Sequence, residues 1–145
     1  MTAEQLAKKL HEMLGEMSDA AGNDEFMSKY EYVLLHGIPM EPADSDGLAG
    51  LGAPQACFAN AQMFTKGDFH YAEGFAIHEG LPIILHHAWV IDGIGRVLDP
   101  TPLWDHEVRA YYGVTFDQEA IEENISPENL SVIDQWQKGF PLLKR

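Results

Sequence analysis

The chain has 145 residues, a length that fits one folded domain, because two domains would each be small for an independent core. Hydrophobic residues make up 46% and aromatic residues 10%, which supports a packed core and excludes wholesale disorder. With 9 Lys and Arg against 23 Asp and Glu, the formal net charge is −14, so a nucleic acid would meet a repelling field.

The single cysteine excludes an internal disulfide and a zinc site made of several thiolates. The longest apolar stretch, around residues 81–91, is too short to span a membrane and carries two histidines. Residues 1–14 mix charged with apolar side chains, which is not the pattern of a secretory signal. We therefore expect a cytoplasmic protein with no membrane or nucleic-acid partner. The sequence leaves its oligomeric state open.

Two helices are predicted within residues 1–37. The first carries one apolar stripe at helical spacing, formed by Leu6, Leu10, Met13, Leu14 and Met17. The second fits residues 24–36, with Gly37 as its C-terminal stop. Residues 38–54 are rich in Pro and Gly, which predicts a loop. The acidic residues in this loop lack a full calcium-binding pattern, which favours a solvated loop: Glu41, Asp44 and Asp46.

A short buried helix is predicted over residues 55–65, and strands follow it. Alternating apolar residues favour strands at 69–77, 82–92, 96–99 and 111–116. The Gly93-Ile94-Gly95 sequence is typical of a turn between two of them. The order of helices, sheet and helix predicts an α+β fold rather than alternating βαβ units.

The last part of the chain, residues 117–145, is predicted to be helical. Ser126 and Pro127 have the residue types of a helix N-cap and first helical position, and Gly139 can end that helix. Its apolar face would be formed by Leu130, Ile133 and Trp136. An earlier group of carboxylates favours the exposed face of a short helix: Asp117, Glu119, Glu122 and Glu123.

Cys57 is the first candidate for chemistry. It follows a loop rich in Gly and Pro and lies at the start of an apolar helix. Free N–H groups and partial positive charge at a helix start stabilise a thiolate and can hold an oxyanion. Free cysteines are also among the most buried residue types, so Cys57 taken alone favours a structural side chain.

His87 is the second candidate, on the strand that carries Trp89 on the same face. A histidine base needs a group that orients its ring, and Asp99 supplies one. A three-residue turn would pair Trp89 with Asp99, which makes Asp99 the diagonal neighbour of His87 on one face. A turn of two or four residues would shift the register and send Asp99 to the other face. The site therefore depends on that turn.

The segments Cys57-Phe58-Ala59-Asn60-Ala61, Tyr71-Ala72-Glu73-Gly74-Phe75, His87-Ala88-Trp89 and Asp99-Pro100-Thr101 resemble the transglutaminase-like branch of the papain-like cysteine protease superfamily. The resemblance covers roughly residues 55–101, and its most specific part is the His-Ala-Trp and Asp-Pro-Thr pair. It departs from the family at Ala56, where Trp or Gly is usual, and at His70 and Tyr71, where an upstream Arg is missing.

The resemblance implies a Cys-bearing helix packed on an antiparallel sheet, with Cys57 as nucleophile, His87 as base and Asp99 as orienting carboxylate. The catalytic core would span residues 55–116 of a single domain. It implies thiol-dependent acyl transfer on a carboxamide through a thioester, with no cofactor and no metal. Hydrolysis, deamidation and transamidation fit equally, and the substrate would be a protein, a peptide or a small amide.

Three further residues are candidates for lining the site. Gln55 could donate to the oxyanion, or could be a capping or surface residue. Trp89 could cover the His–Asp pair, or belong to the ordinary core. Asn60, one helical turn beyond Cys57, could face the same cleft or bond to a neighbouring loop.

Two other functions fit the sequence. A non-catalytic binding or inhibitory protein could keep the same fold. A metal-binding protein could use histidines that lie on neighbouring strands together with a glutamate, although no compact ligand motif is present: His70, His78 and His86, with Glu73 or Glu79.

Overall fold

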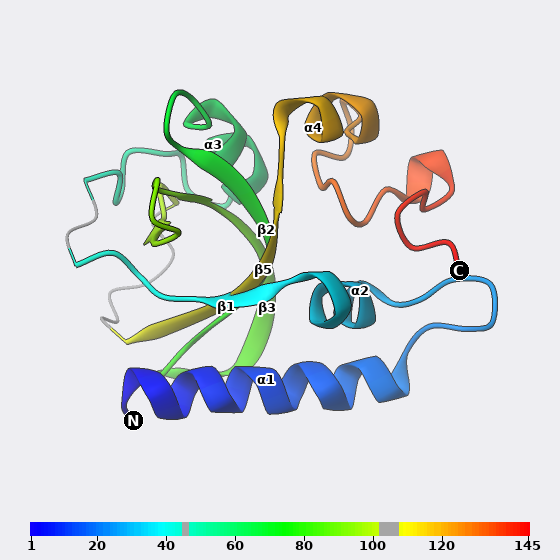
Figure 1. Ribbon diagram of the computed structural model, residues 1–145, viewed down its shortest axis with the longest axis horizontal. Coiled ribbons are helices and arrows are strands. Elements are labelled where there is room, and N and C mark those ends of the chain that lie inside the picture. The colour runs from blue at the N-terminus through cyan, green and yellow to red at the C-terminus, as the bar shows by residue number, and fades with distance from the viewer. Residues whose placement is uncertain (45–46, 102–107) are drawn as a thin grey trace.

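The computed structural model describes residues 1–44, 47–101 and 108–145 (Figure 1). Its helices in chain order are α1 (Ala3–Ala20), α2 (Lys29–His36), α3 (Cys57–Met63), α4 (Gln118–Asn124) and a short 3-10 helix, η1 (Trp136–Lys138). Its strands are β1 (Ile38–Met40), β2 (His70–His78), β3 (Leu81–Ile91), β4 (Val97–Leu98) and β5 (Arg109–Phe116). The fold is α+β, as the order of the predicted elements indicates.

The strands form one curled antiparallel sheet in the order β1-β5-β2-β3-β4. The central strand β2 pairs with β3 on one side and β5 on the other. Its Gly74 lies opposite Gly113 of β5, and a Cβ on Gly74 would come within 2.1 Å of the Tyr112 carbonyl oxygen. Glycine is therefore required in this pair of strands at the position where Gly74 and Gly113 lie opposite each other.

Each face of the sheet carries its own apolar cluster. The larger cluster joins side chains of α1 and α2 to side chains on one face of the sheet. It includes Leu6, Leu10, Leu14, Val33, Tyr71, Phe75 and Ile77. The smaller one lies on the opposite face and includes Met40, Ala72, Ala76, Trp89, Ile91, Val97 and Tyr111. Because side chains alternate along a strand, neighbouring residues of β3 belong to different faces.

The structure confirms the stripe of the first helix over most of its length. Leu6, Leu10 and Leu14 are buried, but Met17 is 38% exposed near the C-terminal end of α1. A capping box fixes the start, in which the Thr2 hydroxyl accepts from the Gln5 backbone and the Gln5 side chain accepts from Thr2 N.

The second helix is shorter than predicted. It begins at Lys29 with Ser28 as its N-cap, not at residue 24. The preceding residues form a turn instead, because the Asn23 side chain accepts from the backbone N–H groups of Glu25 and Phe26. The prediction that residues 38–54 form only loop is also wrong at its start, since Ile38–Met40 form the edge strand β1.

The predicted C-terminal helix is wrong. Ser126 and Asn129 close a short turn with two backbone hydrogen bonds, and the following residues are irregular up to η1. The cause is tertiary, because the N–H groups of Val132 and Ile133 donate to a buried carboxylate rather than within a helix. Trp136, expected on the apolar face, is 60% exposed. The earlier group of carboxylates does belong to a short helix, α4, and Asp117 is its N-cap.

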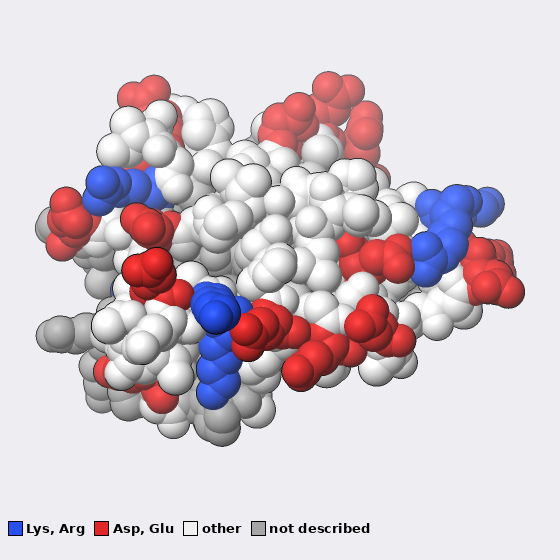
Figure 2. All heavy atoms as spheres, turned by 60° about the horizontal axis from the view of Figure 1, so that its bottom comes forward, with Lys and Arg blue, Asp and Glu red and all other residues white. Residues whose placement is uncertain are grey.

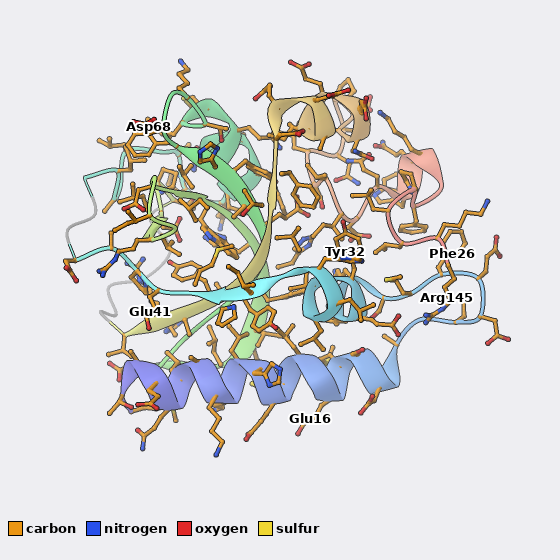
Figure 3. The ribbon with its side chains drawn as sticks, viewed as in Figure 1. Glu16, Phe26, Tyr32, Glu41, Asp68 and Arg145 are labelled. Carbon is orange, nitrogen blue, oxygen red and sulfur yellow. The ribbon has the colours of Figure 1, made fainter. Side chains whose placement is uncertain are left out.

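The end of the chain folds back on the α1–α2 connection (Figure 3). Arg145 donates to both carboxylate oxygens of Glu31, at 2.8 and 3.2 Å, and to the Asn23 carbonyl at 2.7 Å. Phe26 packs edge-on against Phe140 beside it. The last residues are therefore fixed to the helical layer.

Acidic side chains are spread over the face that carries α1, with only a few basic side chains between them (Figure 2). Across the ranges given above, none of the helices is long and apolar enough to cross a membrane.

Candidate functional site

Cys57 is the first residue of α3, as the sequence predicts for a nucleophile at a helix start. The helix is shorter than the predicted range of 55–65, and Gln55 lies outside it. The Gln55 backbone has φ +60°, in the left-handed region that residues with a side chain rarely adopt. The Cys57 thiol is half-buried, so it is neither a core side chain nor fully exposed.

The hairpin between β3 and β4 has the register that the site requires. Val90 pairs with Leu98 and Ile91 with Val97, and Gly95 has φ +84° in the turn. The Asp92 N–H donates to the Arg96 carbonyl, which closes a three-residue loop. The prediction from the Gly93-Ile94-Gly95 spacing is confirmed, and His87 and Asp99 face the same side.

His87 and Asp99 form a buried hydrogen-bonded pair. The His87 Nε2 atom lies 2.8 Å from Asp99 Oδ2, and the two residues are 2% and 1% exposed. The same Asp99 oxygen accepts from the Tyr111 hydroxyl at 2.9 Å, and its Oδ1 accepts from Thr101 N at 3.1 Å. The carboxylate is therefore held by three donors, and its direction toward the imidazole is fixed.

The environment of His87 favours its charged form. Burial alone would lower its pKa, but hydrogen bonds to Asp99 and Cys57, with the attraction of both groups, raise the pKa to about 9. Because Asp99 takes Nε2, the ring nitrogen left for the Cys57 sulfur is Nδ1. The three predicted residues thus meet in the order thiol, imidazole, carboxylate.

Trp89 forms a wall of this site. It is fully buried, its ring stacks on His87 with centroids 6.0 Å apart, and its Nε1 donates to the Met40 sulfur at 3.3 Å. A Cβ at Gly113 would lie 2.6 Å from the Trp89 ring, so glycine there leaves room for the indole. Trp89 therefore shields the imidazole, and it is core and site wall at once.

One sequence alternative placed Asn60 in the same cleft as Cys57, and the structure does not show this. Asn60 bonds to a neighbouring loop, which was the other alternative. Its side chain is 1% exposed, donates to Thr101 Oγ1 and the Ala53 carbonyl, and accepts from Ala53 N. The amide joins the loop before α3 to the segment after Asp99, and it holds the helix that begins at Cys57 next to the His–Asp pair. A Cβ on Gly52 would overlap this amide.

A cleft of about 320 Å³ opens beside Cys57. One wall is the start of α3 with the two residues before it, and the other is a turn from the C-terminal part of the chain: Gln55, Ala56, Cys57, Phe58 and Ala59 against Glu128, Asn129 and Leu130. A larger hollow of about 700 Å³ lies between α1 and β1, and none of the three site residues lines it. Of these two hollows, only the smaller cleft is lined by Cys57.

Glu73, which the metal-binding alternative offered as a ligand, is a buried carboxylate. It is fully buried and accepts five hydrogen bonds, from Tyr71 Oη, His86 Nε2, Ser131 Oγ, Val132 N and Ile133 N. Burial alone would raise the pKa of Glu73, but the bonds from His86, Ser131 and Tyr71 hold it below its usual value. The carboxylate fixes the segment that supplies the second wall of the cleft.

The metal-binding alternative finds no geometric support in the parts of the chain that the structure covers. There, no three His, Cys, Asp or Glu side chains come together as a group that could hold a metal ion. His86 bonds Glu73, and His70 is exposed. In the acidic loop, Asp44 pairs with Arg96 at 3.3 Å, and Asp46 lies outside the described residues.

Two contributors to the site were not found from the sequence. Tyr111 was expected only as the start of a strand, and its contact with Asp99 depends on the register of β5 against β2 and β1. The Tyr111 side chain lies on the same sheet face as Met40 and Trp89. Once the strand order is known, the alternation of side chains along β5 predicts this face. The cleft wall at Glu128 was hidden by the incorrect helix prediction.

Searches of protein-family models, of curated proteins and of solved structures each find no match to this chain.

Proposed function

We propose that this protein is a thiol-dependent enzyme that transfers the acyl group of a carboxamide through Cys57, His87 and Asp99, on a papain-like, transglutaminase-like core. One observation carries the proposal. A half-buried thiol at a cleft lies close enough to an imidazole to raise its pKa, and Nε2 of that ring lies 2.8 Å from a buried carboxylate. This is the arrangement of nucleophile, base and orienting group that covalent catalysis requires.

The chemistry follows from the proton on His87. With a pKa of about 9, the imidazole holds a proton at neutral pH and can stabilise negative charge on the Cys57 sulfur. The thiolate attacks the carbonyl carbon, a C–S bond forms, and the carbonyl π electrons move to oxygen. As the tetrahedral intermediate collapses, the C–N bond breaks and His87 gives its proton to the departing amine. The product is a thioester on Cys57.

Water or an amine then resolves the thioester. Neutral His87 takes a proton from the incoming nucleophile, the C–S bond breaks, and the thiolate–imidazolium pair is restored. Water gives a carboxylic acid, and an amine gives a new amide. We assign the developing oxyanion to backbone N–H groups in the first turn of α3, with Gln55 on the same cleft wall as a further donor.

The rate of Cys57 alkylation by iodoacetamide tests the proposal. At neutral pH, the folded protein should react at least about tenfold faster than a His87→Ala variant, because that variant loses the group that holds the thiolate. His70→Ala is the matched control, since His70 is exposed at the start of β2. Circular dichroism confirms that each variant is folded during labelling.

Release of ammonia from glutamine-containing peptides is the second measurement, and Cys57→Ser should abolish it. Equal alkylation rates in the protein and the His87→Ala variant would contradict the proposal. That result would favour a non-catalytic binding or inhibitory role for the same fold.

A further inference from the structure

The cleft beside Cys57 has an asymmetric charge. Among the described residues that line it, Glu128 is the one ionisable group apart from the thiol, and none of them is Lys or Arg. The remaining lining includes the apolar side chains of Phe58 and Leu130. A ligand that reaches the thiol therefore passes an apolar wall and a carboxylate.

Glu128 is held on a well-fixed turn. Ser126 and Asn129 exchange two backbone hydrogen bonds, at 2.9 and 3.1 Å, and Gln62 of α3 donates to the Leu130 carbonyl at 2.7 Å. The last of these bonds joins the turn directly to the helix that carries Cys57. The position of the Glu128 backbone relative to the thiol is therefore set by hydrogen bonds on both sides of it.

The charged side chains of the chain segment before this turn are acidic, and Lys138 is a cation that lies beside them, where it donates to the Glu123 carbonyl at 3.0 Å. Helix α4, which comes just before it in the chain, carries Glu119, Glu122 and Glu123, and the whole chain has a net charge of −14. The one described contact to the Glu128 carboxylate is a long one of 3.5 Å from the uncharged Gln137 amide. Its charge is thus left for a cationic ligand.

We propose that this cleft selects substrates that carry an aliphatic cation, an ammonium or guanidinium on an alkyl stem, and that Glu128 is the residue that selects them. The stem would lie along Phe58 and Leu130 while the cation pairs with the carboxylate. The chemistry of the substrate rests on the proposed function, but the charge preference of the cleft is a property of the folded protein and is measured separately.

Two methanethiosulfonate reagents of similar size measure that preference on Cys57 itself. One carries a trimethylammonium group and the other a sulfonate. In each, the thiolate attacks the sulfenyl sulfur, a mixed disulfide forms, and methanesulfinate leaves. The ratio of the two rate constants, divided by the ratio for a small free thiol, reports the potential at the thiol. We use the intact protein at low salt and at about 1 M salt, where the Debye length is about 3 Å.

The corrected ratio should exceed one at low salt and approach one at high salt. Glu128→Gln should lower it by about threefold to fivefold at low salt, because one exposed carboxylate near the cleft is lost. Glu16→Gln removes the same charge from α1, on the opposite side of the molecule from α3, and should leave the ratio unchanged (Figure 3). An unchanged ratio in Glu128→Gln, with the protein still folded, overturns the proposal.

Turnover then identifies where the cation resides. It belongs to the acyl donor if glutamine peptides with a neighbouring Lys are hydrolysed faster than peptides with Glu. It belongs to the acceptor if a diamine is incorporated, RCONH₂ + R′NH₂ giving RCONHR′ + NH₃, which mass spectrometry detects. In either case Glu128→Gln must reduce the preference. If no turnover is found while the labelling ratio stays intact, the proposed acyl-transfer activity is refuted. The proposal that the cleft selects cations is not.

Discussion

At the scale of single residues, the site depends on the hydrogen bonds that the Asp99 carboxylate accepts. Its two oxygens accept from His87, Tyr111 and the Thr101 backbone, so the carboxylate is buried and unable to turn. A carboxylate held in this way stabilises a proton on the imidazole beside it. The protonation of His87 therefore becomes a measurable part of protein stability.

The free energy of unfolding should fall as pH rises from about 6.5 to about 9. The pKa of His87 is about 9 in the folded protein and about 6.5 in an unfolded chain. The stabilisation is therefore complete below the lower value and is lost as pH rises through the higher one. We expect a loss of roughly 1–3 kcal/mol, given about 1.4 kcal/mol for each unit of pKa difference.

Urea unfolding at a series of pH values measures this slope. His87→Gln should flatten it over the same window, whereas His70→Gln, at an exposed position, should leave it as it is. If His87→Gln keeps the full slope, the charge on His87 does not stabilise the folded state.

At the scale of elements, the turn of residues 93–95 aligns the site. It fixes β4 so that Asp99 follows on the face of β3 that carries His87. A second set of hydrogen bonds holds β4 from the outside, where Ala43 N donates to the Val97 carbonyl and Val97 N to the Glu41 carbonyl. The pairing of base and carboxylate is thus a property of one hairpin.

Insertion of one glycine after Ile94 should separate His87 from Asp99. A four-residue loop shifts the register of β4 by one residue and sends Asp99 to the other face. We expect the alkylation rate of Cys57 to fall to that of His87→Ala, while circular dichroism still shows the folded sheet. The control is a glycine inserted after Gly47, in the loop before α3, which changes no strand register. Alkylation at the rate of the original protein would contradict the role of the turn.

Local patterns explain which elements and residues were predictable. The α1 stripe, the start of α3 and the three-residue turn depend on neighbours in sequence, so these elements and the pairing of His87 with Asp99 were predictable. Contacts between distant segments were not found. Ser126 and Pro127 have good helix-start chemistry, but the N–H groups that follow are bound by Glu73, about 60 residues earlier in the chain. Propensity carries no information about such a partner.

At the scale of the whole molecule, Glu73 joins the centre of the sheet to the C-terminal part of the chain. It lies on β2 and accepts from Ser131, Val132 and Ile133 just after the turn that carries Glu128. Lys29 of α2 adds an ion pair to Asp134 at 3.5 Å. One wall of the cleft is thereby attached to the core through a buried carboxylate.

Glu73→Gln should destabilise the protein by about 2–4 kcal/mol, because an amide has one acceptor oxygen and turns its NH₂ toward groups that are themselves donors. Hydrogen exchange of residues 126–137 should become faster than in the rest of the chain. Glu79→Gln, a partly exposed position just after β2, is the matched control. Unchanged exchange in residues 126–137 would show that Glu73 does not hold this segment.

His86 and His87 are adjacent in the chain, yet their rings lie on opposite faces of β3. His86 bonds Glu73 and packs against Phe58 and Phe75, whereas His87 bonds Asp99. Their ring nitrogens therefore give two spectroscopic signals from two halves of the molecule. In a nitrogen-15 spectrum, a ligand that perturbs only the His87 resonance acts at the thiol. One that also shifts the His86 resonance has reached Phe58, which packs against that ring and lines the cleft, or has moved the segment that Glu73 holds.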